Sequence, residues 1–543
     1  MSDSHTVANA ANPTVDDLRL CHEVGLTDQH TNRAVLVVGP DIMIRAVGTR
    51  SAVSDDHDRS MCPIATNHLR TKPPTQDYAP AKLLQQRQEA QGRGGRSRTH
   101  ATANRAHYAR QIAHALCNNT KVTSSFSSSP IGRILPRHAH SAVHEALADT
   151  RVVLVNGARQ CGKSTLVSRI GREIGATWRS LDKPETRQAA GYDPTQFVLD
   201  DSLLIIDEVQ RVPELLLAIK ETVDADGRPG RFLLTGSAHV MALRSVPDAL
   251  PGRMETIELW PLSQGEIDGA PDRFVDCAFE RGPQLRHDGT EKRDDYIERI
   301  ARGGFPEAVA REGKRRSRFF SSYVADLINR DVMQLSEIER SAEMFTLTNL
   351  VAARSGQLLV PGALGNELGL PKDTVTRYLR LLEEVFLIKR IPAWSRNLTT
   401  RAVATSKVFM VDSGIATYLC GADPRALRAV NGPLGSLLEG FVAAELARQL
   451  TWSDQEARMF HYRTRDNVEV DIILENNRRE VIAIEVKAAA TVKGEDFRGL
   501  RHLAERLGDD LLAGYVLYTG TETLPFGPKF RALPVSTLWN ARP

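Results

Sequence analysis

The stretch that decides the fold reads Val152-Val153-Leu154-Val155-Asn156-Gly157-Ala158-Arg159-Gln160-Cys161-Gly162-Lys163-Ser164-Thr165. Residues 157–165 fit the pattern G-x-x-x-x-G-K-[ST]. An apolar strand, 152–155, enters the loop, and an amphipathic helix, 164–174, leaves it. The two glycines allow the backbone to wrap a phosphate with its N–H groups pointing inward, and the helix adds the positive end of its dipole. The stretch therefore predicts that residues 157–165 bind a nucleotide.

Two side chains of this loop carry the expected chemistry. Lys163 is expected to reach the β- and γ-phosphates as a mobile positive charge, and Ser164 to offer its hydroxyl to Mg²⁺. Cys161 stands at a variable position of the pattern and is expected to pack within the loop. A nucleoside triphosphate and Mg²⁺ are thus the predicted ligands of this loop.

A second apolar run, 203–206, ends in Asp207 and Glu208. This places both acids at the carboxyl edge of a parallel sheet, where open α/β sheets bind their ligands. We expect Asp207 to hold Mg²⁺ and Glu208 to act as the general base that polarises the attacking water.

A third strand, 232–234, is followed by Thr235 and Ser237, and Arg253 precedes a fourth apolar run. Ser237, or else Thr235, is expected to sense the γ-phosphate; the alternative is that both cap the next helix. Arg253 is expected to stabilise the transition state, within the subunit or across to a neighbour, which would require a homo-oligomer. The alternative for Arg253 is a surface ion pair.

Apolar runs that alternate with helical stretches predict an α/β fold with a parallel sheet and helices on both faces. The predicted helices near this sheet cover 141–147, 164–174 and 213–223, and the last strand covers 256–259. We expect five segments: an extension (1–136), the nucleotide-binding core (137–263), a helical lid or connector (264–344), a helix-turn-helix unit (345–430) and a C-terminal domain (431–543).

Composition narrows the class of protein. The 543 residues carry 70 Lys and Arg against 67 Asp and Glu, so the chain as a whole is not a basic nucleic-acid coat. The six cysteines form no C-x-x-C pair, which argues against a disulfide scaffold or a structural zinc site. No secretory signal or membrane-spanning run is apparent, and a cytoplasmic protein without membrane contact is expected.

The first 136 residues differ from the rest. Residues 59–137 hold thirteen Lys and Arg against two acids, with few large aliphatic side chains, so disorder is expected. This basic stretch is interpreted either as a nucleic-acid-binding arm or as a solvated tail without a role. His138, His140 and His144 suggest a metal, but no nearby Cys or carboxylate in the sequence completes a set, so surface histidines are expected.

The chain resembles the AAA-superfamily ATPases of bacteria and archaea that carry a C-terminal domain of unknown function. The resemblance rests on GARQCGKST, SLDKPETRQAA, LLIIDEVQRVPELLLAIKETVD, GRFLLTGSA and LPGRMETIELWPLSQGE, then on GGFPEAV (303–309), YVADLINRDV (323–332) and the C-terminal motifs. It implies ATP binding and hydrolysis, without a cellular role. Arg159 and Gln160 are typical of this family's loop.

Residues 345–395 are interpreted as a winged helix-turn-helix. Helices are expected over 345–354, 361–368 and 371–385, with a turn at Gly369 and a wing from 386–391 and 407–411. Lys372, Thr374, Arg377 and Arg380 of the third helix are expected to face outward. This helix is predicted either to read DNA in the major groove or to serve as a protein-interaction or lid module.

The last domain is expected to begin with a helix, 437–450, that carries Glu439. A hairpin of strands 469–474 and 481–486 follows, and it carries Asp471, Glu485 and Lys487. The three acids and the lysine resemble the restriction-endonuclease-like fold, in which the acids bind Mg²⁺ and the lysine stabilises developing charge. A degenerate nuclease fold used only for binding is the favoured interpretation.

The main hypothesis is a Mg²⁺-dependent ATPase that acts on DNA or is regulated through it. The alternatives are a nucleotide-gated regulatory protein with negligible turnover and an ATP-regulated DNA nuclease.

Overall fold

A computed structural model describes residues 134–237, 250–333, 341–397, 399, 401 and 405–542. The expected extension, 1–136, therefore lies almost wholly outside the described residues. No helix within the described ranges combines the length and apolarity needed to cross a membrane.

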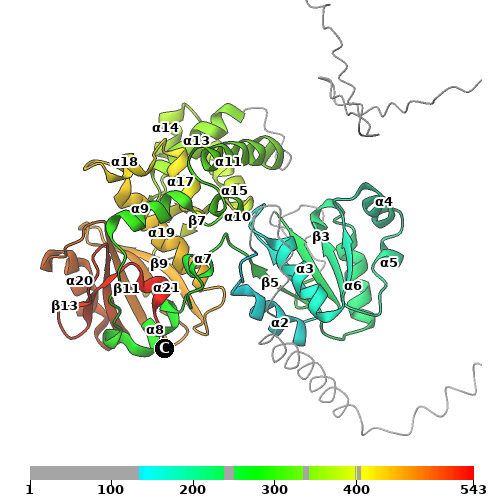
Figure 1. Ribbon diagram of the computed structural model, residues 1–543, viewed down its shortest axis with the longest axis horizontal. Helices are drawn as coiled ribbons and strands as arrows, with labels where there is room; N and C mark the ends of the chain where they lie inside the picture. The colour runs from blue at the N-terminus through cyan, green and yellow to red at the C-terminus, as the bar shows by residue number, and fades with distance from the viewer. Residues whose placement is uncertain are drawn as a thin grey trace, which may run out of the picture. The chain divides into compact units, whose positions relative to one another are not determined.

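A parallel five-stranded sheet forms the first domain, in the order β2-β3-β4-β1-β5 (Figure 1). Its strands are β1 (Val152–Asn156), β2 (Thr177–Ser180), β3 (Leu204–Asp207), β4 (Phe232–Gly236) and β5 (Met254–Glu258). Its helices are α2 (Ala139–Asp149), α3 (Lys163–Ile174), α4 (Pro184–Tyr192), α5 (Pro194–Phe197) and α6 (Leu215–Ala225). The predicted parallel sheet is confirmed, and β2 is a strand that the sequence analysis missed.

Alternate strand residues face opposite sides of this sheet, as the pleat of a strand requires. Val153 and Ile205 belong to the core that contains the apolar faces of α2 and α3. Leu154 and Ile206 belong to a second core, formed mainly with α6. Helices on both faces explain why the strands read as continuous apolar runs.

A helical region follows the sheet. It contains α7 (Gln264–Asp268), α8 (Phe274–Arg281), α9 (Arg293–Arg302), α10 (Pro306–Val309), α11 (Gly313–Asp326) and a π-helix, η6 (Leu327–Val332). Part of the segment assigned to the lid instead packs on the C-terminal domain. The ring of Phe274 contacts that of Tyr515, and the Tyr515 hydroxyl donates to the Gly282 carbonyl at 2.6 Å.

The next unit contains three helices and a small antiparallel sheet in the order β6-β8-β7. Its elements are α13 (Ser341–Ala353), β6 (Gln357–Leu358), α14 (Pro361–Leu368), α15 (Lys372–Glu384), β7 (Ile388–Ile391) and β8 (Lys407–Met410). Gly369 ends α14 with a φ of 67°, as expected for the turn. The helices and strands lie where they were predicted, while the name winged helix stays a prediction.

The C-terminal domain has a six-stranded mixed sheet in the order β13-β14-β12-β11-β10-β9. Two short helices, α17 (Ser413–Leu419) and α18 (Pro424–Arg428), precede it. The domain contains α19 (Leu434–Gln449), β9 (Ala457–Arg463), β10 (Glu469–Asn476), β11 (Val481–Lys487), α20 (Arg498–Leu507), β12 (Leu511–Tyr518), β13 (Leu524–Pro525), β14 (Phe530–Pro534) and α21 (Thr537–Asn540).

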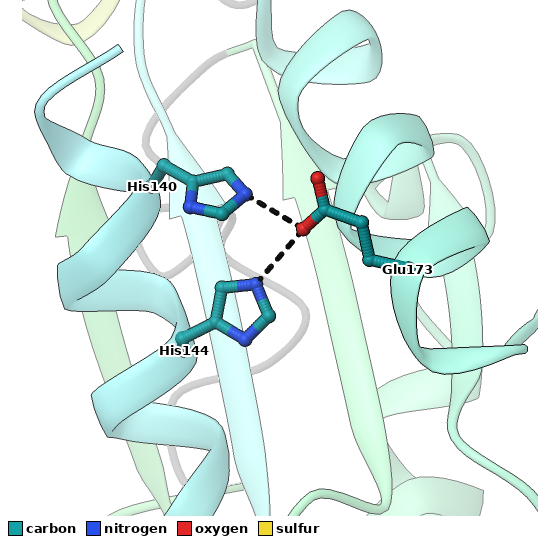
Figure 2. A group of neighbouring side chains, drawn as sticks. All are labelled: His140, His144 and Glu173. Carbon is teal, nitrogen blue, oxygen red and sulfur yellow. Dashed lines mark hydrogen bonds and ion pairs between the residues drawn. The ribbon is translucent and has the colours of Figure 1, made fainter. Parts of the chain in front are cut away.

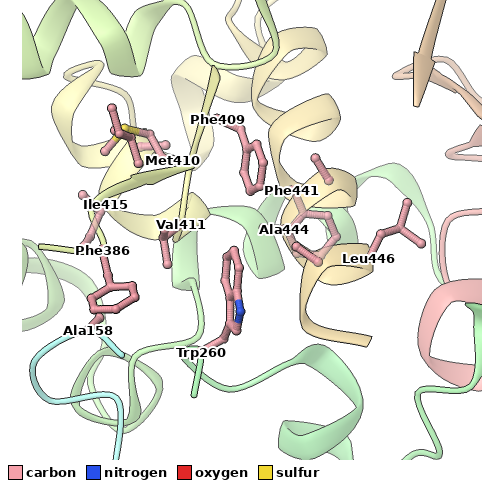
Figure 3. Close-up of a cluster of buried hydrophobic side chains, with 14 of the residues drawn as sticks. Ala158, Trp260, Phe386, Phe409, Met410, Val411, Ile415, Phe441, Ala444 and Leu446 are labelled. Carbon is pink, nitrogen blue, oxygen red and sulfur yellow. The ribbon is translucent and has the colours of Figure 1, made fainter. Parts of the chain in front are cut away.

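One large core runs from the first sheet through the helical region to the C-terminal sheet. Figure 3 shows part of it, in which Ala158 of the glycine-rich loop belongs to the same cluster as Trp260, Phe386 and Phe441. Ala158 and Trp260 are 1% and 4% exposed. The back of the loop is therefore lined by apolar side chains rather than by solvent.

Candidate functional site

The glycine-rich loop joins the carboxyl end of β1 to the start of α3. Gly157 and Gly162 have φ values of 154° and 104°. A Cβ atom on Gly157 would stand 2.1 Å from the Leu259 carbonyl oxygen, so both backbone conformation and close packing require glycine there. The loop thus follows the path that turns its N–H groups toward an anion.

Lys163 is buried at the first position of α3. Its ammonium group donates to the carbonyl oxygens of Gly157 at 3.0 Å and Ala158 at 2.9 Å. These contacts hold the positive charge inside the curve of the loop. A polar side chain that is 4% exposed and whose charge faces a cavity suits the neutralisation of an anion.

Three hydroxyl groups converge on Asp207. Ser164 Oγ donates to Asp207 Oδ1 at 2.8 Å, Thr235 Oγ1 donates to the same oxygen at 2.7 Å, and Ser180 Oγ donates to Oδ2 at 3.3 Å. The structure thus brings together the two residues predicted to hold Mg²⁺. Hydroxyl and carboxylate oxygens are the ligands that Mg²⁺ prefers, so the donor set fits this ion.

Glu208 has a left-handed backbone, with φ of 61° and ψ of 49°. Such a conformation costs about 1–3 kcal/mol for a residue other than glycine and occurs mostly at functional sites. Its carboxylate accepts a hydrogen bond from Ser237 Oγ at 3.0 Å and a short one from Gln210 Nε2. Ser237 therefore lies against Glu208, whereas Thr235 lies against Asp207. Gln210 was not predicted as a site residue, because it belongs to no recognised sequence motif after the acidic pair.

The structure does not bring Arg253 to the loop. This residue precedes β5, at the amino edge of the parallel sheet, whereas the loop leaves the carboxyl edge of β1. Its guanidinium pairs with Asp224, with Nη2 and Oδ2 3.0 Å apart. The expected role within the subunit is therefore wrong, and the alternative of an ion pair is the one observed. A role across a subunit interface stays a prediction.

Arg137, which the sequence analysis missed, ties the loop to the segments around it. It donates to the carbonyl oxygens of Cys161 at 2.8 Å and Trp260 at 2.6 Å, and its Nε pairs with Glu266 Oε1 at 3.0 Å. The Cys161 thiol is fully buried and donates to the Leu259 carbonyl oxygen at 3.3 Å. Cys161 therefore packs within the loop, as expected.

The helical region also contacts the loop. Arg159 pairs with Asp331 of η6, with Nε and Oδ2 3.1 Å apart, and the Tyr323 hydroxyl donates to the Arg159 carbonyl oxygen at 3.3 Å. Burial raises the pKa of Asp331, an effect that Arg159 opposes and the charge of Glu208 reinforces. Arg159 therefore links the glycine-rich loop to the helical region, a role that could not be predicted from its position in the sequence.

A cavity of about 960 Å³ opens in front of the loop. Its polar end includes Lys163, Ser164 and Glu208, and its apolar wall comes from distant segments: Ile134, Leu135, Leu262, Ile267, Val309 and Ala310. A pocket of this size with an apolar wall and a few charged groups suits a ligand that has both a flat ring and phosphates.

The four residues predicted for the nuclease-like site also converge. The antiparallel register pairs Ile472 with Ile484, which places Asp471 opposite Glu485. Lys487 Nζ lies 3.5 Å from Glu485 Oε2. Burial raises the pKa of Glu439 to about 7 and that of Glu485 well above its usual range, and the charge of Asp471 adds to both effects.

A lysine that the sequence analysis missed lies among these acids. Lys407, at the start of β8, is 2% exposed, and its ammonium group lies 2.6 Å from Glu439 Oε1, 2.8 Å from Glu469 Oε1 and 3.3 Å from Asp471 Oδ1. Burial opposes the charge of Lys407, but Asp471 and Glu439 outweigh it and raise its pKa. A cation from the chain itself therefore pairs with two of the three acids predicted to hold Mg²⁺, Glu439 and Asp471.

The family models define the class of protein. Residues 149–268 match the model described as an AAA domain, and they include the loop, the acidic pair and the parallel sheet. The chain therefore contains a P-loop ATPase domain of the AAA type, and ATP binding is its function at this coarse level. Residues 293–426 and 434–538 match two domains of unknown function, DUF8612 and DUF4143.

Similar proteins occur in bacteria. Two uncharacterized proteins, from Mycobacterium bovis and Mycobacterium tuberculosis, are each 28% identical over 408 residues, which span 74% of this chain and 84% of theirs. An uncharacterized protein of Haemophilus influenzae is 22% identical over 318 residues, which span 57% of this chain and 72% of that protein.

Two solved structures show a limited similarity to this chain. The Walker-type ATPase paby2304 of Pyrococcus abyssi is 14% identical, with a TM-score of 0.33, over 53% of this chain and 96% of that one. A RuvB structure of Thermotoga maritima is 22% identical, with a TM-score of 0.24, over 48% and 90%.

Proposed function

We propose that the protein hydrolyses ATP with Mg²⁺ and uses the resulting movement on DNA. The observation that carries the first part is the arrangement around β3. Ser164 and Asp207 share a hydrogen bond of 2.8 Å, and Glu208 next to them is held by Ser237 and Gln210. A metal-holding pair beside a positioned carboxylate is what phosphoryl transfer to water requires.

Each residue then has a defined task. The loop amides and Lys163 bind the phosphates, and Ser164 and Asp207 hold Mg²⁺, which neutralises charge on the phosphates when it is bound. Glu208 accepts a proton from the attacking water, and Ser237 and Gln210 orient its carboxylate. The apolar wall at Ile134, Leu135 and Val309 takes up the base.

ATP binding is coupled to the helical region by contacts that the glycine-rich loop makes. Nucleotide that settles against Gln160 and Lys163 displaces the neighbouring Arg159, whose side chain pairs with Asp331 and whose carbonyl is bound by Tyr323. Both partners belong to the helical region that leads to α13. ATP binding is therefore expected to bias the position of the helix-turn-helix unit.

Glu208→Gln is the variant that tests hydrolysis. Gln keeps the size of the side chain but cannot accept a proton from water, so phosphate release should fall by about 10²-fold or more while ATP binding persists. Phosphate release under steady-state conditions and retention of labelled ATP on a filter would measure the two effects. Glu214→Gln, an exposed glutamate before α6, is the matched control and should behave as wild type.

The same measurements distinguish an ATPase from the alternative function, a nucleotide-gated regulatory protein with negligible turnover. Such a protein would bind ATP but show no Mg²⁺-dependent phosphate release that Glu208→Gln could lower. That outcome would reject hydrolysis and keep the nucleotide site.

DNA contact is proposed for α15, the third helix of the predicted winged helix-turn-helix. Val375, Leu379 and Leu382 are buried, whereas Lys372, Arg377 and Arg380 are exposed. A helix with one apolar face and a row of positive charges on the other supports docking against phosphates.

Arg377→Ala combined with Arg380→Ala should weaken DNA binding. The slope of log affinity against log salt is negative, and each lost phosphate contact should reduce its magnitude by about one. The reduction should be the same at every DNA sequence tested. Fluorescence anisotropy with duplex DNA over a salt series measures this slope. The matched control is Arg498→Ala with Arg506→Ala, two exposed arginines on α20. Equal slopes in the two double variants would remove α15 as the DNA-contacting element.

A further inference from the structure

Three side chains with metal-ligating atoms meet on the outer wall of the ATPase domain. His140 and His144 lie one turn apart on α2, and both point toward Glu173 near the end of α3 (Figure 2). Their Nε2 atoms lie 2.9 and 3.3 Å from the same oxygen, Glu173 Oε2. Within the described ranges this is the single group of three or more His, Cys, Asp or Glu whose ligating atoms all lie within 4.8 Å of one another.

The group corrects an expectation from the sequence. His140 and His144 were expected to be surface histidines because no neighbouring residue completes a ligand set. Glu173 does so from 33 and 29 residues away, because α2 packs beside α3. The side chains of His140, His144 and Glu173 are 20%, 11% and 25% exposed, so the cluster is a partly covered site rather than a set of free side chains.

A neighbouring arginine orients the carboxylate of the cluster. Both imidazoles contact the same carboxylate oxygen, Glu173 Oε2. Arg169 binds the other carboxylate oxygen, Oε1, at 3.0 Å and so turns Oε2 toward the imidazoles.

We infer that His140, His144 and Glu173 form a binding site for a divalent transition-metal ion, with Zn²⁺ as the best match. Two imidazole nitrogens and one carboxylate oxygen are a zinc ligand set with one coordination position left for water. Mg²⁺ and Ca²⁺ prefer oxygen-only sets and are poor candidates.

The position of the site indicates what the metal does. α2 leads directly into β1, and α3 carries Lys163 and Ser164 at its start and Glu173 at its last turn. His140 also lines the cavity in front of the loop. A metal ion that joins α2 to α3 therefore fixes the outer wall of that cavity, independently of whether ATP is hydrolysed.

Cobalt(II) is the probe, because Co²⁺ absorbs visible light when it is bound by about four ligands, as the proposed site would bind it. The full chain, stripped of metal with a chelator, should develop this band with Co²⁺ and lose it when Zn²⁺ is added. His140→Gln, His144→Gln and Glu173→Gln should each abolish the band and weaken zinc binding by more than about tenfold. Zinc should also raise the Tm of the wild type but not of the variants.

The control is Glu145→Gln, an exposed glutamate on α2 itself, which should bind as wild type. The chain has further histidines before residue 138, so only a difference between variants of the full chain counts. If His144→Gln does not fold, His140→Gln and Glu173→Gln, whose side chains are more exposed, decide the result. Equal zinc affinity and an equal Tm shift in wild type and in these two variants would overturn the proposal.

Discussion

Lys163→Ala is expected to abolish ATP binding in calorimetry at millimolar Mg²⁺ and to lower phosphate release by at least about 10³-fold. In the proposed function, the buried ammonium of Lys163 neutralises the β- and γ-phosphates. Its removal also leaves the carbonyl groups of Gly157 and Ala158 without their donor. The phosphates would then meet backbone dipoles alone, without a full positive charge.

The matched control is Lys183→Ala, because Lys183 is an exposed lysine of the same domain, just before α4. It should bind ATP as wild type. Retained affinity in Lys163→Ala, with the fold intact by circular dichroism, would mean that the loop does not bind the triphosphate in the proposed way. The roles of Ser164, Asp207 and Glu208 would then lose their support.

Lys407→Met is expected to lower the free energy of unfolding by about 3–5 kcal/mol, the range for breaking a buried ion pair from one side. Methionine fills a similar volume but leaves Glu439, Glu469 and Asp471 without the cation that now contacts all three. Denaturation in urea measures the loss. Adding Glu439→Gln to Lys407→Met should recover part of it, because one unpaired charge is then gone.

The loss should depend on pH. Burial and then the charge of Asp471 raise the pKa of Glu439 to about 7, from 4.5. The native protein therefore holds a proton that the unfolded chain releases between these values, and stability falls as pH rises through this window. Without Lys407 the pKa rises further, so Lys407→Met should cost more at about pH 8 than at about pH 5.5. An equal loss at both values would show that Lys407 does not neutralise these acids.

The same lysine argues against the nuclease alternative. We expect no Mg²⁺-dependent DNA cleavage by the wild type, because the Lys407 ammonium competes with a metal ion for Glu439 and Asp471. Cleavage that both Asp471→Ala and Lys487→Ala remove would contradict this and establish the nuclease.

The sequence predicted those parts of the site that lie on one continuous stretch. The path of 152–165 follows from local patterning, since the glycines, the apolar strand and the amphipathic helix are adjacent in the chain. Asp207 was predicted to meet Ser164 because the carboxyl ends of neighbouring parallel strands share one edge of the sheet. Strand β2 was missed because Thr177–Ser180 is short and has no apolar run.

Contacts between segments that are far apart in the chain could not be predicted from the sequence. Arg137, Tyr323 and Asp331 reach the loop because of how helices pack, and no spacing rule connects them to it. Lys407 lies 64 residues before Asp471, on a strand that was assigned to the wing. Arg253 was considered for the site as an arginine just before a strand of the core, but the direction of β5 places it at the opposite edge of the sheet.

The apolar cluster behind the phosphate loop has a consequence for how the molecule unfolds. Because Ala158 and Trp260 share one continuous core with Phe386 and Phe441, the matched domains bury apolar surface against one another. A fragment that ended at residue 268 would expose this apolar surface to water and should aggregate. A piece that spans all three matched segments is expected to keep this surface buried and to stay soluble.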